Sequence, residues 1–542
     1  MTDVPTLTSA TTANYCVLNP LSNPNGPIFT LSNGNLNYSC SASAGNGAKM
    51  AVISTMALHT GKVYWEILAT NTNGGYGVSS ELTVSSVYGV AYANVYSSTQ
   101  ASTSGITYSG TTFTYTTNDT LGFAWDGTAL TLGCYKNGSL IGTFSGFSST
   151  TVYFPQMQPA TASASTTFSA NFGQQPFAQT PPTGFVALNT FNLPTPTIGA
   201  TASTQASDYF NVVTWTGNGT SSGRSITGVG FQPDFVWGKA RSVAYGHGLY
   251  DAVRGSGKLL VSNNTNSEAT NFLYGYLSSF DSDGFTTTPG SSSNENWNQT
   301  NATYVAWNWK ANGAGSTNTA GSITSTVSAN TTAGFSIVTW TGNNSSATIG
   351  HGLGVTPQMI IWMHRTNPGA YHHGVYHASL PSAAYALQLS TSLGQSSDNN
   401  WWNSTAPTPS VFTVGGYNIS DTMVAYCFAE VAGYSKIGKY TGTGAGDSNG
   451  PFIYCGFRPA FIIIKADANG YNWAMMDSKR PGYNSISYRI MADVANEETT
   501  VGDPQIDFLS NGFKLRAGIS NYAGTVYYMA FAEHPFKYAN AR

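Results

Sequence analysis

The chain has 542 residues, enough for three to five domains at about 100–200 residues each. Only 8% of its residues are charged, where about 25% is typical of a soluble protein, while the hydrophobic fraction is an ordinary 41%. Gly, Ser, Thr and Asn take the place of the missing charges, and a net charge of −3 offers no basic patch for nucleic acid or for anionic lipid.

The N-terminal tract MTDVPTLTSATTANY lacks the basic and then apolar segments of a signal peptide. No apolar run approaches the roughly 18–20 residues that a membrane span needs. We therefore expect a protein made in a cytoplasm, not exported by the usual route and not inserted in a membrane. The cysteines are odd in number and widely separated, which indicates reduced structural thiols and predicts neither a disulfide framework nor a zinc site.

Residues 1–188 consist of short apolar or alternating segments separated by turn residues, which predicts a β-sandwich. In KVYWEIL, Val63, Trp65 and Ile67 alternate and should point to one face of a sheet. Asn137-Gly138 suits a two-residue hairpin turn that requires positive φ.

The order of motifs in this region is fairly specific. CVLNPL from Cys16, GKVYWEI from Gly61, LGFAWDG from Leu121 and YKNG before Ser139 follow one another along the chain. This order resembles a bacteriophage version of the SPRY domain. The resemblance covers about the first third of the chain and implies a concanavalin-like β-sandwich.

Two tracts have the composition of linkers. Residues 189–207 carry Pro194 and Pro196, which should stiffen the chain, followed by Ala, Ser and Thr. Residues 312–333 consist of Gly, Ser, Thr and Asn with almost nothing to bury, so we expect them to be flexible or draped over the surface.

The remainder of the chain repeats itself three times, over residues 208–311, 334–432 and 433–542. Each copy begins with VTWTG or GKYTG, continues with a strand such as FQPDFVW, and ends with YVAWNW, MVAYCF or YMAFA. The spacing agrees if Ala306, Ala425 and Ala530 are taken as equivalent. The pattern predicts three related antiparallel β-sandwich-type modules, the last two packed together. Repeated modules typically build long surfaces and spacers, which favours binding and architecture over catalysis.

Several motifs in the repeats allow two interpretations. Asp281-Ser282-Asp283-Gly284 opens like a calcium loop but lacks the acidic twelfth residue, which favours a hairpin turn. Asp251 near Arg254, and Asp477 near Lys479-Arg480, form either a polar binding patch or, as we prefer, an ion pair that fixes a turn.

Histidine gathers in the second repeat. His373 aligns with His247 and with Trp473, which fits a packing position. Metal binding by His372 or His377 on the axis of a trimer remains open, although the sequence shows no ligand spacing for it.

No nucleophile elbow, HExxH motif or nucleotide-binding loop occurs, so we expect no catalytic residues, no cofactor and no enzyme activity. Glycan hydrolysis needs only two carboxylates, and Glu268 and Glu295 are the loop acids to test.

Aromatic residues in Asn-rich loops are the most plausible binding chemistry. Sugar rings stack on indole faces while neighbouring amides bond to their hydroxyls. The alternative is that these tryptophans cap the ends of the sandwiches. The predicted receptor-binding residues are Asn294, Asn296 and Trp297 in one loop, and Asn399, Trp401, Trp402 and Asn403 in another.

Residues 205–537 resemble modules of phage tail-fibre and tail-tip proteins, and the ending AFAEHPFKYANAR is similar to that of many such proteins. The resemblance implies a virion structural protein that is assembled in the host cytoplasm. Its expected partners are other virion proteins, further copies in a homotrimer, and a bacterial surface glycan or receptor. No virion-anchoring segment, coiled coil or β-helical shaft is recognisable, so a head fibre or capsid-decoration protein is the alternative. An envelope polysaccharide depolymerase is the third possibility.

Overall fold

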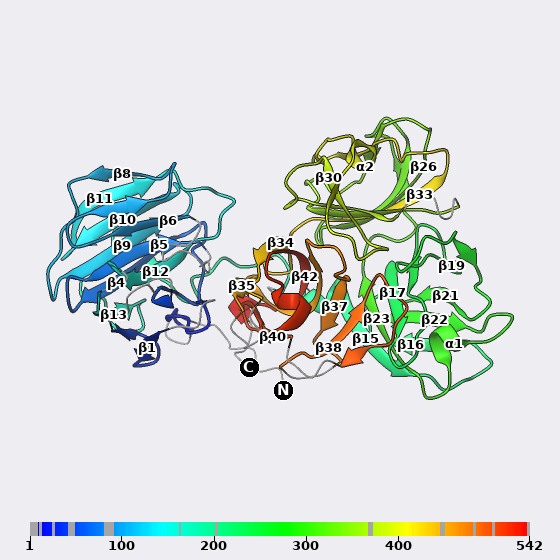
Figure 1. Ribbon diagram of the computed structural model, residues 1–542, viewed down its shortest axis with the longest axis horizontal. Helices are drawn as coiled ribbons and strands as arrows, with labels where there is room; N and C mark the ends of the chain where they lie inside the picture. Colours follow the sequence, from blue (N-terminus) through cyan, green and yellow to red (C-terminus); the bar gives the residue numbers. More distant parts are fainter. Residues whose placement is uncertain are drawn as a thin grey trace.

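The computed structural model describes residues 9, 13–23, 28–41, 49–80, 91–161, 164–199, 201, 204–366, 372–444, 450–480, 484–500 and 505–538. The chain is almost entirely antiparallel β-structure, so the predicted all-β fold class is confirmed (Figure 1). The helices in these ranges are single turns, and none of them could cross a membrane.

The N-terminal sandwich consists of two sheets. One runs in the order β1 (Phe29–Ser32), β2 (Asn37–Cys40), β13 (Thr166–Asn171), β4 (Lys62–Ala69), β9 (Thr120–Asp126), β10 (Thr131–Lys136), β11 (Ser139–Ser145) and β8 (Thr107–Gly110), with β14 (Val186–Ala187) beside β4. The other runs in the order β3 (Val52–Ile53), β12 (Phe154–Pro159), β5 (Gly74–Ser79), β6 (Tyr92–Val95) and β7 (Gln100–Ser102).

The alternation in β4 explains why these sheets pack together. Val63, Trp65 and Ile67 are fully buried in one core with residues of the second sheet, as predicted. Asn137 and Gly138 have φ of 46° and 84° and join β10 to β11, so the predicted hairpin turn is confirmed.

The three repeats are called modules 1, 2 and 3 in chain order. Module 1 is built on a four-stranded sheet and two small ones. The first runs in the order β15 (Phe210–Thr216), β23 (Thr303–Trp309), β17 (Phe235–Ala240) and β18 (Gly248–Asp251). The second contains β16 (Arg224–Thr227), β22 (Gly284–Thr288) and β21 (Tyr276–Asp281), and the third pairs β19 (Lys258–Leu259) with β20 (Ala269–Thr270). The short helices are η3 (Ala206–Asp208) and α1 (Glu295–Asn298).

Module 2 repeats this arrangement with an extended main sheet. Its order is β24 (Ser316–Asn318), β25 (Ser325–Asn330), β26 (Phe335–Thr341), β33 (Thr422–Phe428), β28 (Met359–His364), β29 (Gly374–His377), β30 (Tyr385–Gln388) and β31 (Ser396–Ser397). Strands β27 (Ala347–Gly350) and β32 (Val411–Val414) pair on the other side, and α2 (Asn399–Trp402) closes one end.

The prediction that residues 312–333 form a linker, either flexible or draped over the surface, is therefore wrong. This tract supplies β24 and β25, and β25 pairs with β26 from Thr326 to Asn330. Ladder hydrogen bonds join backbone groups whatever the side chains are, so a polar tract can extend a sheet by two strands. Composition alone could not show this.

Module 3 has a main sheet in the order β34 (Ser435–Thr441), β42 (Thr525–Pro535), β36 (Phe457–Ala466), β37 (Ala474–Asp477), β38 (Tyr488–Met491) and β39 (Thr499–Thr500). A smaller sheet contains β35 (Phe452–Tyr454), β41 (Gly512–Leu515) and β40 (Ile506–Leu509). The short helices are η4 (Gly518–Asn521) and η5 (Phe536–Tyr538).

The strand register corrects the alignment of the third copy. Val213 pairs with Ala306 and Val338 with Ala425, whereas their equivalent, Gly438, pairs with Tyr528 rather than Ala530. A shift of two residues keeps each side chain on the same face of a strand, so the apolar pattern did not reveal the error.

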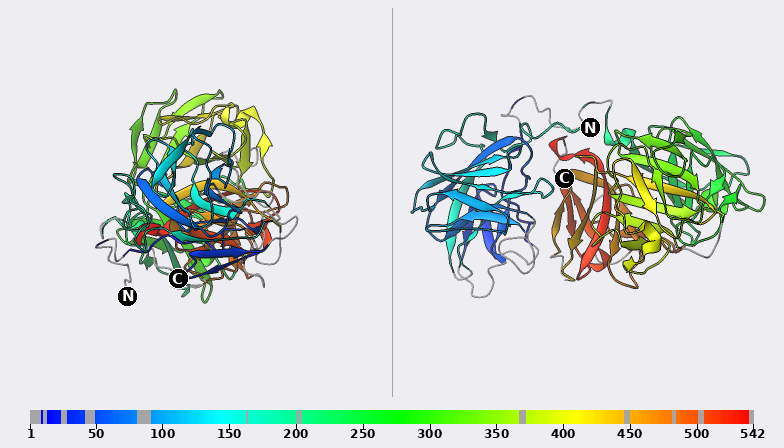
Figure 2. Two further views of the ribbon diagram at one scale, coloured as in Figure 1. Left: turned by 90° about the vertical axis from the view of Figure 1, so that its left-hand side faces the viewer. Right: turned by 90° about the horizontal axis from the view of Figure 1, so that it is seen from above.

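The three modules share one hydrophobic core and contact one another in cyclic order (Figures 1 and 2). Aromatic pairs join every two modules, with centroid distances of 4.1, 6.0 and 5.7 Å for Phe235–Tyr426, Phe428–Phe531 and Phe210–Phe461. The expectation of a long spacer is therefore wrong for residues 205–535. Each module carries a second apolar face that only the other two modules can cover.

Equivalent hydrogen bonds repeat at the three junctions. At the same position of each module, the N–H of an aromatic side chain donates to a backbone carbonyl of the module before it in the cyclic order. The accepting residues are also equivalent to one another. The bonds are 2.9 Å long and join His247 to Met491, His373 to Val261 and Trp473 to Gln388. His and Trp replace one another there because both present an N–H on a flat ring.

Charged pairs lie beside these bonds. Glu268 of module 1 bonds to Arg365 of module 2 at 2.8 Å, and Glu498 of module 3 bonds to Arg241 of module 1 at 2.7 Å. At the third junction, the backbone N–H of Gln395 donates to the Asp467 carboxylate at 3.1 Å. The cyclic order is thus specified by polar contacts as well as by the shared core.

The N-terminal sandwich lies against module 3 (Figure 2). Asn511 donates to the carbonyl of Thr55 at 2.7 Å, and the Phe154 and Tyr454 rings are 5.3 Å apart. After β42, Lys537 donates to the carbonyl of Leu193 at 2.6 Å in the connecting segment. The end of the chain therefore helps to hold the sandwich in place.

Candidate functional site

The three tryptophans predicted to contact a receptor are buried. Trp297, Trp401 and Trp402 expose 2%, 3% and 1% of their surface. Trp297 stacks on Trp215 with centroids 6.2 Å apart, and Trp401 packs on Tyr417 at 4.7 Å. The prediction that their indole faces bind sugar is therefore wrong. They cap the ends of the sandwiches, because α1 and α2 turn them inward.

The asparagines predicted with them are divided between two modules. Asn399 and Asn403 are exposed on α2, where Asn399 accepts from Ser404 and Asn403 ends the helix with φ of 49°. Asn294 and Asn296 are half-buried at α1, and Asn296 lines a pocket. The two loops therefore do not form one site.

This pocket, called the Asn pocket here, has a volume of about 300 Å³. The loop between β19 and β20 supplies most of its amides, and the segment after β20 supplies two aromatic rings. Its lining includes Asn263, Asn264, Asn266, Phe272, Tyr274 and Asn296.

The wall of the Asn pocket is held by a module junction. Asn263 accepts a hydrogen bond from the backbone of His247 at 2.9 Å. The carbonyl of Asn264 accepts from His373 of module 2 at 2.8 Å, and the Asn264 side chain accepts from the backbone of Asn266 at 3.0 Å. The loop is therefore ordered without a ligand.

The chemistry of the Asn pocket suits a sugar. Tyr274 is 40% exposed, and the Phe272 ring lies 5.5 Å away at an angle of 73°. Within the described ranges, the side-chain amides of Asn266 and Asn296 make no hydrogen bond, so their donors and acceptors are open to a ligand. An open aromatic face beside free amides can stack on a pyranose ring and bond to its hydroxyls.

Module 3 has a pocket at the equivalent place, called the Arg pocket here, with a volume of about 620 Å³. Ala474 pairs with Met491 as Gly374 pairs with Gln388, and Leu249 bridges to Leu260 in the same register. Equivalent residues of the two pockets are therefore Gly246 and Asn472, Leu259 and Arg489, and Val261 and Met491. Tyr471 and Tyr522 complete the Arg pocket with rings 4.6 Å apart.

Residues 205–535 match DUF7483, a domain family of unknown function. The chain belongs to the DUF7483 family. The match covers all three modules, which agrees with their single shared core, so modules 1 to 3 are called the DUF7483 unit from here on.

No curated protein matches the sequence. Solved structures similar to the chain include the TRIM65 PSpry domain, with 15% identity, a TM-score of 0.21, and coverage of 29% of this chain and 91% of that one. Stonustoxin is similar with 18% identity and a TM-score of 0.20, covering 31% of this chain and 30% of that one.

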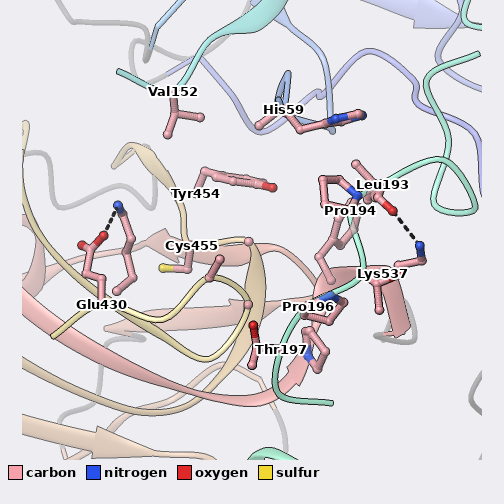
Figure 3. Close-up of a pocket in the computed structure, with 18 of the residues that line it drawn as sticks. His59, Val152, Leu193, Pro194, Pro196, Thr197, Glu430, Tyr454, Cys455 and Lys537 are labelled. Atoms are coloured by element: carbon pink, nitrogen blue, oxygen red, sulfur yellow. Dashed lines mark hydrogen bonds and ion pairs between the residues drawn. The ribbon is translucent and has the colours of Figure 1, made fainter. Parts of the chain in front are cut away.

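A third cavity of about 520 Å³ lies where the N-terminal sandwich meets the DUF7483 unit (Figure 3). His59 and Val152 of the sandwich face Tyr454 and Cys455 of module 3, with Pro194 beside them. Burial lowers the pKa of His59 to about 4 and raises the pKa of the Cys455 thiol. A neutral imidazole and a protonated thiol indicate a gap between domains rather than an activated nucleophile.

Of the two acids proposed for hydrolysis, Glu268 has its carboxylate in ion pairs. Glu268 lies between Arg254 and Arg365, at 3.0 and 2.8 Å. Burial acts to raise the pKa of Glu268, but the bonds from these arginines lower it below the ordinary value, which does not suit a general acid. Glu295 begins α1, and its carbonyl accepts from Tyr304 at 2.6 Å.

Of the two histidines named for metal binding, His377 serves packing and His372 lies at the surface. His377 is buried; its Nε2 donates to the carbonyl of Tyr528 at 3.2 Å and its Nδ1 accepts from the backbone of Ser379 at 3.1 Å. His372 is exposed and contacts Ser390. No group of three or more metal-ligating side chains occurs in the part of the chain that the structure describes.

The remaining motifs fold as their local interpretations predicted. Asp251 pairs with Arg254 and Asp477 with Arg480, and both carboxylates also accept backbone N–H groups of the following turn. Asp281 pairs with Gly284 across a hairpin turn. All five cysteines are free and buried.

Three residues that line the pockets escaped the sequence analysis. Tyr274 and Phe272 stand in NFLYGY without a tryptophan or an Asn-rich context, and Arg489 lies in an ordinary strand. The alignment of Arg489 with two apolar residues, Leu259 and Ala386, is the one signal that could have singled it out, and it requires the correct strand register.

Proposed function

We propose that the protein is a structural protein of a phage particle, a tail-fibre or tail-tip adhesin that binds a glycan on the bacterial surface. The Asn pocket is the observation that carries the proposal. It combines an exposed tyrosine with amides that have no partner in the described residues, on a loop that a module junction already orders.

The mechanism is adhesion without chemistry. A small open pocket of this kind gives weak binding to one sugar, and several copies on one particle gain avidity through effective concentration. Because the loop is ordered before binding, little conformational entropy is lost when a ligand is bound. The homotrimer implied by the family resemblance would add further copies, and native mass spectrometry tests it.

The distribution of charge also supports a binding role. Glu268, Arg365, Glu498 and Arg241 pair across module junctions, so these charges hold the DUF7483 unit together instead of forming a field around it. A surface of hydroxyls and amides then remains for neutral ligands. Such a surface suits protein that is displayed on a particle at high local concentration.

The test measures binding of the purified, labelled protein to host cells. It compares alanine variants of two neighbouring residues. Tyr274 and Leu273 are exposed to nearly the same extent, 40% and 41%, but only Tyr274 lines the Asn pocket. Tyr274→Ala should weaken cell binding by roughly tenfold or more, as for an aromatic residue at the centre of a binding site, and Leu273→Ala should not. Equal binding of both variants and the unaltered protein would contradict the proposed site.

Electron microscopy with a gold-labelled antibody against the chain tests its location. Label at the distal tail supports the adhesin, whereas label over the capsid would favour the head-fibre or decoration alternative. Release of sugar from host envelope by the purified protein would instead identify a depolymerase. Virions without label would remove the proposal of a particle protein.

A further inference from the structure

The Arg pocket contains a cation, Arg489, that pairs with no carboxylate of the described residues. Of the seven other arginines in the DUF7483 unit, six lie within ion-pair distance of a carboxylate: Arg241, Arg254, Arg365, Arg458, Arg480 and Arg516. The seventh, Arg224, donates instead to the Thr216 carbonyl at 2.8 Å and to the Asn298 side chain at 2.6 Å. Arg489 has no carboxylate partner among the described residues. Its one protein contact there is a long bond from Nη1 to the Gln505 side chain, at 3.4 Å, and its Nε is buried without a partner.

This arrangement is unfavourable in the protein alone. Removing a guanidinium from water costs free energy that a carboxylate normally offsets. Burial lowers the pKa of Arg489 and no acidic neighbour raises it again. An anion in the pocket would supply the missing partner.

The fold does not require an arginine at this position. Leu259 is the equivalent residue in module 1 and Ala386 in module 2, and both are buried in the apolar interior of their own module. The strand pairings described above place Leu259, Ala386 and Arg489 at equivalent positions in equivalent strands of the three modules. The charge is therefore an addition specific to module 3.

The remaining lining indicates what carries the anion. Tyr471 and Tyr522 lie 4.6 Å apart with their rings inclined by 59°, and both are partly exposed. Asn472 adds a side-chain amide, and the volume of about 620 Å³ is sufficient for one or two sugar rings. Tyrosine faces and an amide suit a pyranose, as in the Asn pocket.

We propose that the Arg pocket binds an acidic sugar, whose carboxylate pairs with Arg489 while its ring packs against Tyr471 or Tyr522. A guanidinium can bond to both oxygens of a carboxylate, which fixes the orientation of the sugar as well as its charge. The choice of a sugar rests on the adhesin proposal above. The choice of an anion rests on Arg489 alone.

Isothermal titration of the full-length chain with tri-galacturonate tests this proposal. Arg489→Gln should weaken binding by at least about tenfold, and so should replacement of the ligand by a neutral galactose trisaccharide. Lys479→Gln is the matched control, because Lys479 is exposed in the same module, is absent from the pocket lining, and loses the same charge. It should leave the affinity unchanged.

The stability of the variants separates a ligand site from a structural role. Arg489→Gln should not lower the melting temperature, since it removes an unpaired, half-buried charge. If that variant fails to fold, Arg489→Leu serves instead, because the equivalent residue of module 1 is Leu259. Undiminished tri-galacturonate binding by these variants, or no binding by the unaltered chain, would overturn the proposal. So would preference for glucose 1-phosphate, which would identify a phosphate site.

These measurements use purified protein and soluble sugars, so their outcome is independent of the cell-binding test with Tyr274→Ala. Loss of cell binding in that variant together with absent tri-galacturonate binding would leave the adhesin proposal standing and remove the acidic sugar.

Discussion

One buried asparagine recurs at the same position in all three modules. Asn298, Asn418 and Asn521 are buried, and each bonds to the segment that follows the first strand of its module. These bonds tie the segment before the last strand of each module to the segment after its first strand. A buried amide remains stable there because its donors and acceptors have partners.

Replacing this residue should destabilise the module. Asn418 accepts from Trp340 at 3.0 Å and donates to Asn343 and to the Ser345 carbonyl, so Asn418→Leu leaves several buried groups unpaired. At about 1–3 kcal/mol for each unsatisfied group, we expect a loss of roughly 3 kcal/mol in the free energy of unfolding. Urea denaturation measures it.

Asn403→Gly is the control for that measurement. Asn403 is exposed and has positive φ, which glycine adopts without strain, so its replacement should change stability by less than about 0.5 kcal/mol. Equal losses in both variants would show that the buried bonds of Asn418 contribute nothing specific.

At the scale of elements, the junctions explain why three sheets form one unit. In two of them a glutamate from the segment before β20 or β39 reaches an arginine that follows the central strand β28 or β17. In the third, Gln395 and Asp467 take these positions, and Tyr527 donates to Gln395 at 3.1 Å. The third junction thus keeps the geometry, but a hydrogen bond from a neutral backbone N–H to a carboxylate replaces the ion pair.

Removing the charge at one junction should weaken the whole unit. Arg254 and Arg365 share the Glu268 carboxylate, whose side chain is only 8% exposed. Glu268→Gln replaces this charged acceptor by a neutral amide. We expect a loss of about 2 kcal/mol in the free energy of unfolding, because a desolvated pair is broken on one side. Glu430→Gln, at the more exposed pair with Lys436, should cost less than about 1 kcal/mol. A larger loss in Glu430→Gln, again by urea denaturation, would contradict this order.

At the scale of the whole molecule, neutral histidines hold the modules together. In His247 and His377, Nδ1 accepts an N–H group while Nε2 donates to a carbonyl of another module. Burial lowers the pKa of these residues to about 3 and about 4, and the pKa of His373 to about 4. Protonation of Nδ1 would set two donors against each other and break the junction.

Stability should therefore fall in acid. Because the folded pKa values lie below the unfolded value of about 6.5, the unfolded chain binds more protons between about pH 6.5 and 4. The free energy of unfolding is then fully present above about pH 6.5 and decreases as the pH falls through this window. Melting temperatures at pH 7.5, 6, 5 and 4 measure the effect.

His373→Gln should flatten this profile, since glutamine keeps a donor but does not titrate. His372→Gln is the adjacent control, and it should leave the profile unchanged because His372 is exposed. A melting temperature that is constant from pH 7.5 to 4, or an equal effect of both variants, would refute the role of the buried histidines.

Much of the fold could be predicted from local patterns. The alternation of Val63, Trp65 and Ile67, the turn at Asn137-Gly138 and the ion pair of Asp251 with Arg254 each depend on a few neighbouring residues. The candidate site could not be predicted in this way. Trp297 is buried and Tyr274 is exposed, although their sequence surroundings favour the reverse, because burial depends on which distant strands cover each ring.

The sequence by itself determined the all-β class, the N-terminal sandwich, the threefold repeat, the reduced thiols and the scarcity of charge. Periodicity, turn residues and composition are local properties, and each short strand or turn depends on only a few neighbouring residues. The tertiary structure alone decided that the repeats form a ring, that residues 316–330 join a sheet, and that Arg489 faces a pocket to which no described residue contributes a carboxylate. These features arise from contacts between residues far apart in the chain. Such contacts contribute to stability only when the modules pack around one core.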